Sequence, residues 1–335
     1  MRATFESYKL LFKIPGGTSR GVLTEKETFF IHLHDEKNKG IGECGLLRTL
    51  SIDDRPDYIK KLEWTCQNIH LGLDVLYTEL QAFPSIQFGL EQAFLDLKST
   101  NHILFPSKFT NGQEGIVING LIWMGAIDFM KKQIEDKLEQ GFSCIKMKIG
   151  SLNFEDEYFI LKQLRKDYPN LEIRVDANGA FHPDEVLDKL EQLAKLNLHS
   201  IEQPIQTKQW KIMSNLCSNT PIPIALDEEL IGIFDYKTKI DLLDSIKPQY
   251  LILKPSLIGG FKGSQEWINL AKQRNISWWI TSALESNVGL NAIAQWTYTL
   301  KNPMPQGLGT GNLYTNNIPS CLEIKGEKLF HNSFL

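Results

Sequence analysis

Five short apolar runs in the middle of the chain each end in a charged side chain that could serve in catalysis or metal binding. The terminal charged residues are Lys148, Asp176, Glu202, Asp227 and Lys254. They lie 28, 26, 25 and 27 positions apart (148 to 176, 176 to 202, 202 to 227 and 227 to 254). A strand of about five residues, a helix and two loops occupy roughly that length. The spacing therefore predicts successive strand–helix units of one parallel barrel, in which all strands end on the face that carries the chemistry.

The three acids would end the third, fourth and fifth strands of this barrel. Neighbouring carboxylates repel one another and have raised pKa values unless a cation lies between them. Carboxylate oxygens suit Mg²⁺, with Mn²⁺ as a substitute. Each acid taken alone would more often be a helix N-cap or a partner in a surface ion pair. Three acids in register favour a metal site formed by Asp176, Glu202 and Asp227.

Three lysines are expected near this metal site. Lys146 and Lys148 are two residues apart and point to one face of a strand, while Ile145 and Met147 point to the other face. A barrel strand has no solvated edge, so both ammonium groups are expected in the barrel mouth, where each lowers the pKa of the other. A lysine with a pKa near neutrality can act as a general base. Lys254 ends the sixth strand, across the barrel from Lys148, so the two would flank a bound substrate.

This set of side chains suits one type of reaction. A metal that binds a substrate carboxylate, with amines beside the α-carbon, favours removal of the α-proton, because the developing negative charge is stabilised as it forms. The residues therefore predict an enzyme that abstracts a proton next to a carboxylate.

The chain is longer than a plain barrel requires. It has 335 residues, whereas such barrels typically need roughly 250, so a second domain is expected. Alternating apolar residues near the start, followed by helical patterns at 53–67 and 86–98, predict an α+β capping domain over residues 1–110. The barrel would occupy residues 111–311. Residues 312–335 have strand character and are expected to return to the first domain.

Composition excludes several classes of protein. The net charge of −4 gives no long-range attraction to nucleic acid or to an anionic membrane. No apolar run is long enough to span a bilayer, and the first residues lack a secretory pattern. Five cysteines without a C-x-x-C pair are typical of reduced thiols in a cytoplasmic protein. The expected partner is a small carboxylate substrate, and both a monomer and a homo-oligomer remain open.

Five motifs in order resemble the enolase superfamily, muconate-lactonising subgroup. They are Lys146-Met-Lys148, Val175-Asp176-Ala-Asn178, Ile201-Glu202-Gln-Pro204, Leu226-Asp227-Glu228 and Leu253-Lys254-Pro255. The resemblance covers most of the chain and implies an α/β fold, a modified TIM barrel of (β/α)₇β type with an N-terminal α+β capping domain. It also implies Mg²⁺ on Asp176, Glu202 and Asp227, with Lys148 and Lys254 as the acid/base lysines.

Within the subgroup, the resemblance favours a lyase of menaquinone biosynthesis. It would remove water from 2-succinyl-6-hydroxy-2,4-cyclohexadiene-1-carboxylate. Lys148 would take the α-proton and then protonate the leaving hydroxyl group, whereas Lys254 would stay protonated and stabilise the anionic intermediate.

Further substrate contacts are expected from Lys146, Arg174, Asn178, Ser282 and Glu285. Arg174 lies two residues before a metal ligand and matches an arginine found in such lyases. Ser282 and Glu285 belong to a stretch that resembles the seventh-strand motif of the family, where a serine and backbone N–H groups hold a substrate carboxylate. Ordinary loop hydrogen bonding would explain Ser282 and Arg174 equally well.

A loop of the capping domain at residues 16–20 is expected to act as a lid. Gly16 and Gly17 permit the backbone change that a lid needs, and Ser19 and Arg20 could then meet the substrate. A plain hairpin turn is the alternative interpretation.

Two other functions remain open. N-acylamino acid racemases and dipeptide epimerases of the subgroup use the same two lysines. Dipeptide epimerases carry Asp-x-Asp near the end of strand eight, whereas residues 307–309 are Gly-Leu-Gly, which disfavours a substrate with a free α-amino group. A barrel that binds a metabolite without turnover would need to lack one of the five charged residues, yet all are present.

Overall fold

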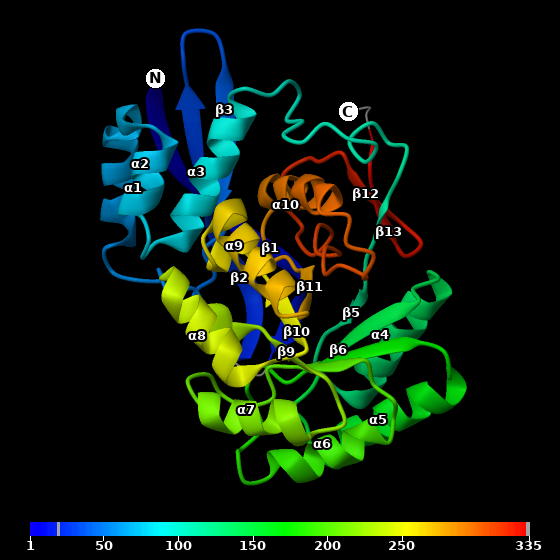
Figure 1. Ribbon diagram of the computed structural model, residues 1–335. Coiled ribbons are helices and arrows are strands. Elements are labelled where there is room, and N and C mark those ends of the chain that lie inside the picture. Colours follow the sequence, from blue (N-terminus) through cyan, green and yellow to red (C-terminus); the bar gives the residue numbers. More distant parts are fainter. Residues whose placement is uncertain (19–20, 333–335) are drawn as a thin grey trace.

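The computed structural model describes residues 1–18 and 21–332, and the first part of it is an antiparallel sheet (Figure 1). Its strands are β1 (Arg2–Thr18), β2 (Gly21–His34) and β3 (Lys39–Cys44), in that order across the sheet. β1 and β2 pair antiparallel along their length, from Arg2 opposite His34 to Thr18 opposite Gly21. Ser19 and Arg20, which were expected in a lid, lie outside the described residues.

Helices cover one face of this sheet. They are α1 (Tyr58–Gln67), α2 (Leu73–Glu79) and α3 (Pro84–Asp96), with a short 3₁₀ turn between the first two. α3 is buried on almost every side because it packs between β3 and the barrel. A Cβ atom on Gly42 of β3 would lie 1.9 Å from the carbonyl oxygen of Gly89 in α3. Glycine is therefore required where this strand and helix meet.

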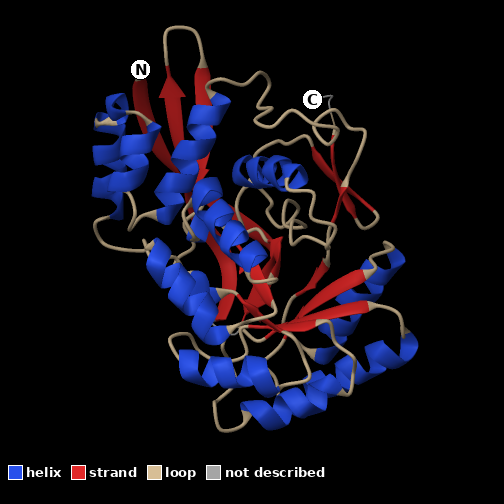
Figure 2. Ribbon diagram, viewed as in Figure 1, coloured by secondary structure: helices blue, strands red, loops and turns tan. Residues whose placement is uncertain are grey.

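The barrel is built from parallel strands that pair in the order of the chain. Among the described residues these strands are β5 (Gly120–Ile122), β6 (Cys144–Lys148), β7 (Glu172–Asp176), β8 (Ser200–Glu202), β9 (Ile224–Leu226), β10 (Tyr250–Leu253) and β11 (Ser277–Ile280). The helices that follow them are α4 (Ile127–Glu139), α5 (Phe154–Asp167), α6 (Val186–Ala194), α7 (Trp210–Asn219), α8 (Tyr236–Ile246), α9 (Gly260–Gln273) and α10 (Asn287–Thr299). Figure 2 shows these helices on the outside of the strands.

A very short eighth strand closes the barrel. The backbone N–H of Asn119 donates to the carbonyl of Gln306 at 3.0 Å, and the N–H of Ser282 donates to the carbonyl of Gly307 at 3.0 Å. Gln306 and Gly307 thus join the chain just before β5 to the chain just after β11. The eighth strand, expected near residues 307–309, begins at Gln306 and is reduced to single bridges. The (β/α)₇β barrel with an N-terminal capping domain is confirmed.

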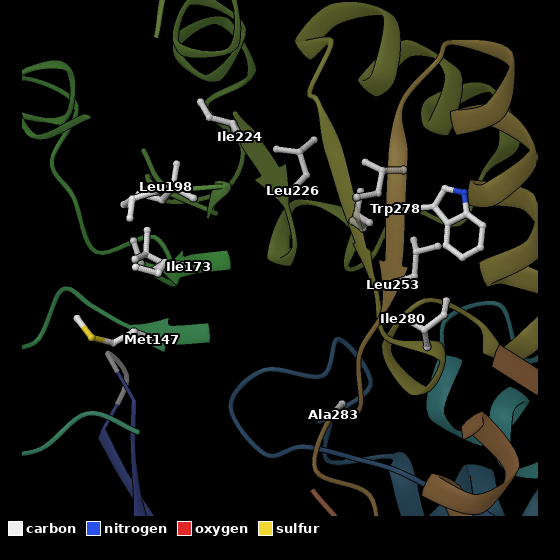
Figure 3. Packing of buried hydrophobic residues seen from close by; sticks show 14 of the residues in the cluster. Met147, Ile173, Leu198, Ile224, Leu226, Leu253, Trp278, Ile280 and Ala283 are labelled. Carbon is white, nitrogen blue, oxygen red and sulfur yellow. The ribbon is translucent and has the colours of Figure 1, made fainter. Parts of the chain in front are cut away.

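The main core lies between the strands and the outer helices. Side chains that point outward from the strands are apolar and buried, as Met147, Ile173, Leu226 and Leu253 show (Figure 3). Parallel strands are buried on both faces, so the alternate residues must fill the barrel interior. In this protein the interior positions near the strand ends are charged, and that difference marks the site.

The C-terminal segment differs from the expectation that residues 312–335 return to the capping domain. Its first part does run beside β1, where the N–H of Lys13 donates to the carbonyl of Leu313 at 2.8 Å. The hairpin of β12 (Leu322–Lys325) and β13 (Lys328–His331) instead pairs with β4 (Ile116–Val117), beside the barrel.

No helix in the described part of the chain is long and apolar enough to cross a membrane. The five cysteines, all within the described ranges, are free thiols.

The contact between α3 and α9 contains a buried carboxylate with a testable pH dependence. Glu91 accepts hydrogen bonds from the backbone N–H groups of Phe261 and Lys262, at the start of α9. Burial raises the pKa of Glu91 to about 7, from 4.5. A raised carboxyl pKa in the folded state stabilises the protein below the unfolded pKa, and this contribution is lost as the pH rises through 7.

When the pH is raised from 4.5 to 7, the unfolding free energy of wild type should fall by on the order of 3 kcal/mol more than that of Glu91→Gln. Urea denaturation of both proteins across that range measures the difference. A difference that does not change with pH would show that Glu91 titrates normally.

Candidate active site

Strand register places the charged residues on one face of the barrel. Lys148 pairs with Asp176 across β6 and β7, and Asp176 pairs with Glu202 across β7 and β8. Asp227 and Lys254 directly follow β9 and β10. All five are therefore at the carboxyl ends of consecutive strands, as the spacing of the charges predicted.

The three acids form a buried cluster. Oxygen atoms of Asp176, Glu202 and Asp227 all lie within 4.8 Å of one another. Burial raises the pKa of Glu202 to about 7 and raises that of Asp227. The second oxygen of Glu202 is buried, and no hydrogen-bond partner for it is found among the described residues. Such a set of oxygen donors fits Mg²⁺, because a divalent cation would both satisfy this oxygen and offset the repulsion.

Ammonium groups surround this cluster. Nζ of Lys146 lies 2.9 Å from Asp176 and also contacts Glu202, and Nζ of Lys148 lies 3.1 Å from Asp176. On the far side, Lys254 pairs with Asp227. Although burial opposes ionisation of Asp176, the neighbouring ammonium groups hold its pKa below the usual value.

The two outer lysines differ in pKa although both are buried. Burial lowers the pKa of Lys148, and the ammonium groups of Lys146 and Lys254 lower it further, outweighing the attraction of Asp176. Burial alone would also lower the pKa of Lys254, but the carboxylates of Asp227, Glu228 and Asp176 together outweigh it and raise that pKa. Two groups whose environments move their pKa values apart are suited to different roles in acid–base chemistry.

Lys146 itself is held in the charged form. Burial alone would lower its pKa, but the carboxylates of Asp176, Glu202 and Asp227 together raise it. Lys146 is thus a fixed positive charge beside Lys148.

Removing this charge gives a prediction about pH. The Lys146→Ala variant should retain more activity than Lys148→Ala, and the acid limb of its kcat/KM profile should move to higher pH. The reason is that Lys148 loses a neighbouring like charge, so its pKa rises and a higher pH is needed to free its amine. A pH–rate profile that matches wild type would count against a role for Lys146 in tuning Lys148.

A cavity of about 300 Å³ opens above the lysines, with walls from both domains. The capping domain contributes residues 21–23 from the start of β2 and residues 47–50 from the loop after β3. The barrel contributes Lys146, Lys148 and Lys254 at the base, with residues 281–284 on one side. A cavity between two domains, over charged groups with little exposure, limits the access of water to a reaction.

Three of the residues expected to contact substrate line this cavity. They are Lys146, Asn178 and Ser282. Asn178 accepts a hydrogen bond from Nζ of Lys148 at 2.8 Å and donates to Glu228 at 3.0 Å, so it orients the lysine. Their contact with substrate remains a proposal.

Arg174 does not line the cavity. Its Nε donates to Glu172 at 2.8 Å, Nη1 donates to the carbonyl of Pro305 at 2.9 Å, and the guanidinium stacks 4.1 Å from the ring centre of Trp279. Arg174 points into the barrel, as expected, but it lies one layer below Asp176. The structure therefore gives it a role in the barrel interior rather than in binding substrate.

Glu285 also lies away from the cavity surface, fully buried. Its carboxylate accepts hydrogen bonds from the hydroxyl of Ser282 at 2.7 Å, from the N–H of Ala283 at 2.7 Å and from Ser256. Because Glu285 is buried behind the cavity wall and accepts the hydroxyl of Ser282, its role here is to hold Ser282 in place.

Sequence reasoning missed several residues of the cavity wall. Asn119 and Trp123 line it next to β5, Thr310 lines it after the eighth strand, and residues 47–50 cover it from the capping domain. Asn119 and Trp123 flank β5, so the predicted first strand gave a signal for them. Residues 47–50 gave none, because loop position relative to another domain is not encoded in local spacing.

Known proteins are similar to this chain in sequence and fold. Residues 130–327 match the family described as enolase C-terminal domain-like. The o-succinylbenzoate synthase of Desulfotalea psychrophila is 44% identical, covering 97% of this chain and 98% of that protein. The crystal structure of MenC from the same organism has a TM-score of 0.88 at 42% identity, covering 98% of this chain and 99% of that chain.

A more distant structure extends the likeness in fold. The dipeptide epimerase from Enterococcus faecalis, complexed with Mg and a dipeptide, has a TM-score of 0.86 at 17% identity, covering 99% of this chain and 96% of that chain. The chain belongs to the enolase superfamily, muconate-lactonising subgroup. Within that superfamily its family is that of the o-succinylbenzoate synthases, which makes it a lyase.

Proposed function

We propose that this protein dehydrates 2-succinyl-6-hydroxy-2,4-cyclohexadiene-1-carboxylate to 2-succinylbenzoate, a step of menaquinone biosynthesis. The observation that carries the proposal is geometric: Lys148 and Lys254 line one cavity, and each contacts one of three clustered, buried acids. The identity of 44% to an o-succinylbenzoate synthase over nearly the whole chain supports this choice of substrate.

Asp176, Glu202 and Asp227 would hold Mg²⁺, or Mn²⁺ in its place. The bound ion would supply positive charge next to the substrate carboxylate, where negative charge develops. Lys146 bridges two of the ligands and keeps them oriented.

Lys148 is proposed to move the proton. Its lowered pKa provides a free amine that takes the α-proton, which breaks the C–H bond and leaves the electron pair on the substrate. The resulting ammonium group then protonates the departing hydroxyl group, the C–O bond breaks, and the ring becomes aromatic as water leaves. Asn178 fixes Nζ of Lys148 during both transfers.

Lys254 is proposed to stay protonated. Asp227 raises its pKa, so its ammonium group persists throughout the reaction and stabilises the anionic intermediate. This division of roles assigns acid–base work to one lysine and electrostatic work to the other.

The cavity wall argues against a substrate with a free α-amino group. Gly307, Gly309 and Thr310 line it where dipeptide epimerases are expected to carry two aspartates. A substrate ammonium group would find no carboxylate there. The hydroxyl of Ser282 and the N–H of Ala283 donate to Glu285, so they are already used within the protein. Thr281 lines the same wall, and its hydroxyl has no hydrogen-bond partner among the described residues, so it could donate to the second carboxylate of a succinyl group. A cytoplasmic location belongs to the same proposal and is supported by the five free thiols.

The test is turnover of the cyclohexadiene carboxylate by purified protein with Mg²⁺, followed by ultraviolet absorbance. Wild type should form 2-succinylbenzoate, and Lys148→Ala should not. Incubation of both enantiomers of an N-succinylamino acid in deuterated water distinguishes the racemase reaction. Exchange of the α-proton without any dehydration of the diene acid would replace the proposed function with racemisation.

A further inference from the structure

A buried carboxylate of the capping domain contacts the barrel next to the cavity wall, and the proposed mechanism does not use it. Glu43, in β3, is fully buried. It accepts hydrogen bonds from the backbone N–H of Ser286 at 2.8 Å and of Gly289 at 2.9 Å, and from the Ser286 hydroxyl. Glu43 thus satisfies donors at the start of α10, where a helix favours negative charge.

The residues packed around the Glu43 carboxylate leave it room, donate a hydrogen bond to it and balance its charge. A Cβ atom on Gly289 would lie 2.9 Å from Oε2 of Glu43, so glycine is needed for the approach. On the other side Glu43 is held by the hydroxyl of Thr28 at 2.8 Å. Nζ of Lys26 lies 3.8 Å away, fully enclosed, with no hydrogen-bond partner among the described residues. Lys26 provides the compensating charge for a carboxylate that has left water.

This contact lies at the junction of three cavity walls. The turn at 281–284 directly precedes α10 and lines the cavity, and Glu285 ties it to Ser282. Glu43 is followed by the wall at 47–50, and Lys26 follows the wall at 21–23 on the same strand. A shift of the Glu43 contact would therefore move the substrate-facing surfaces of both domains relative to each other.

We propose that Glu43 is a positioning residue for substrate binding: by anchoring the start of α10 to the capping sheet, it fixes the 281–284 turn against the cavity. It touches neither substrate nor the catalytic lysines, so its loss should weaken substrate binding more than it slows the chemistry. This inference rests on the proposed function for its kinetic readout, although its structural part does not.

A matched control exists elsewhere in the same interface. Glu91 also belongs to the capping domain, is also buried, and also receives backbone N–H groups at the start of a barrel helix, α9. The residues just before α9, 255–259, do not line the cavity. Glu43 and Glu91 therefore share an architecture and differ in how directly the anchored helix follows the cavity: residues 281–284 lie just before α10, whereas residues 255–259 separate Lys254 from α9.

The experiment compares Glu43→Gln, Glu91→Gln and the double variant Glu43→Gln/Lys26→Met. In Glu43→Gln one acceptor oxygen becomes an NH₂ donor that faces the N–H of Ser286 or Gly289, so the anchor is lost. We expect KM for the diene acid to rise roughly tenfold while kcat changes by less than about threefold. Glu91→Gln should leave both constants near wild type.

The double variant separates positioning from charge compensation. Glu43→Gln leaves the buried ammonium group of Lys26 without a neighbouring carboxylate, and Lys26→Met removes that ammonium group. The double variant should therefore regain stability in urea while KM stays high. If KM returned to the wild-type value together with stability, Glu43 would only neutralise Lys26, and the proposal would be overturned. A KM increase of equal size in Glu91→Gln would overturn it as well.

Hydrogen exchange of the protein alone provides a readout that does not depend on the reaction. Amides at 286–289 should exchange about tenfold faster in Glu43→Gln, and amides at 261–262 should do so in Glu91→Gln. If wild type shows no turnover but these local changes appear, the proposed function is wrong, whereas the structural role of Glu43 in holding the start of α10 is supported. If the amides at 286–289 exchanged at the wild-type rate in Glu43→Gln, the proposed anchoring of α10 by Glu43 would be wrong, whatever the activity.

Discussion

Replacing Lys148 by alanine should lower kcat by about 10⁴-fold, the upper end of the range for a positioned acid or base, because one amine serves two proton transfers. The cause is the loss of the only amine near the cavity base whose pKa is lowered, among the described lysines there. KM should change little, since the substrate carboxylate is proposed to bind the metal. Steady-state kinetics at several pH values measures both constants.

A buried lysine away from the cavity provides the control. Lys239 on α8 is also buried and pairs with Glu266 at 2.7 Å. Lys239→Ala should alter stability in urea but leave kcat within about threefold. Similar kinetics for Lys148→Ala and wild type would exclude Lys148 as the base. Lys254→Ala should lose roughly 10²–10⁴-fold in kcat, because the intermediate loses its ammonium neighbour.

Glu202→Gln should abolish turnover at any practical Mg²⁺ concentration. Glutamine keeps the shape of the side chain and resembles the protonated acid, which the raised pKa of about 7 makes accessible in the folded protein. The fold should therefore tolerate the change, whereas the cation loses one of three charged ligands. Thermal unfolding with and without Mg²⁺ separates the two effects.

Wild type should show an increase in Tm when Mg²⁺ is added, because the ion binds only the folded state. Glu202→Gln should show no such increase in Tm, and its Tm should be near that of metal-free wild type. Recovery of full activity in Glu202→Gln at high Mg²⁺ would mean that Glu202 is not a ligand.

The spacing of charged residues predicted most of the site. Residues at the ends of parallel strands must meet, so intervals near 26 residues were sufficient to bring Lys148, Asp176, Glu202 and Lys254 together. Helix bounds also agreed closely, for example 86–98 against Pro84–Asp96, because apolar residues repeat at helical spacing in that segment. α2 was missed because a helix of seven residues has too few turns to show a period.

How deep a side chain lies in the barrel, and which way it points, were harder to predict than which strand or turn carries it. Alternation indicates that Arg174 points into the barrel, but it does not indicate whether the side chain reaches the mouth or the layer beneath it. Glu285 lies in the expected turn, yet its carboxylate folds back onto Ser282. The roles of Glu43 and residues 47–50 depend on contact between domains, and no local pattern encodes that contact.

The way in which the barrel closes divides its wall into two unequal parts. From β6 to β10 the strands pair continuously, and this arc carries all the charged residues of the site. The remaining seam is joined by single bridges at Gln306 and Gly307, and the segment that follows faces the cavity. Amino-acid changes along the seam could therefore remodel the shape that a ligand meets while the reacting groups keep their spacing. The same barrel can thus come to bind a different carboxylic acid substrate while its acidic residues and lysines stay in place.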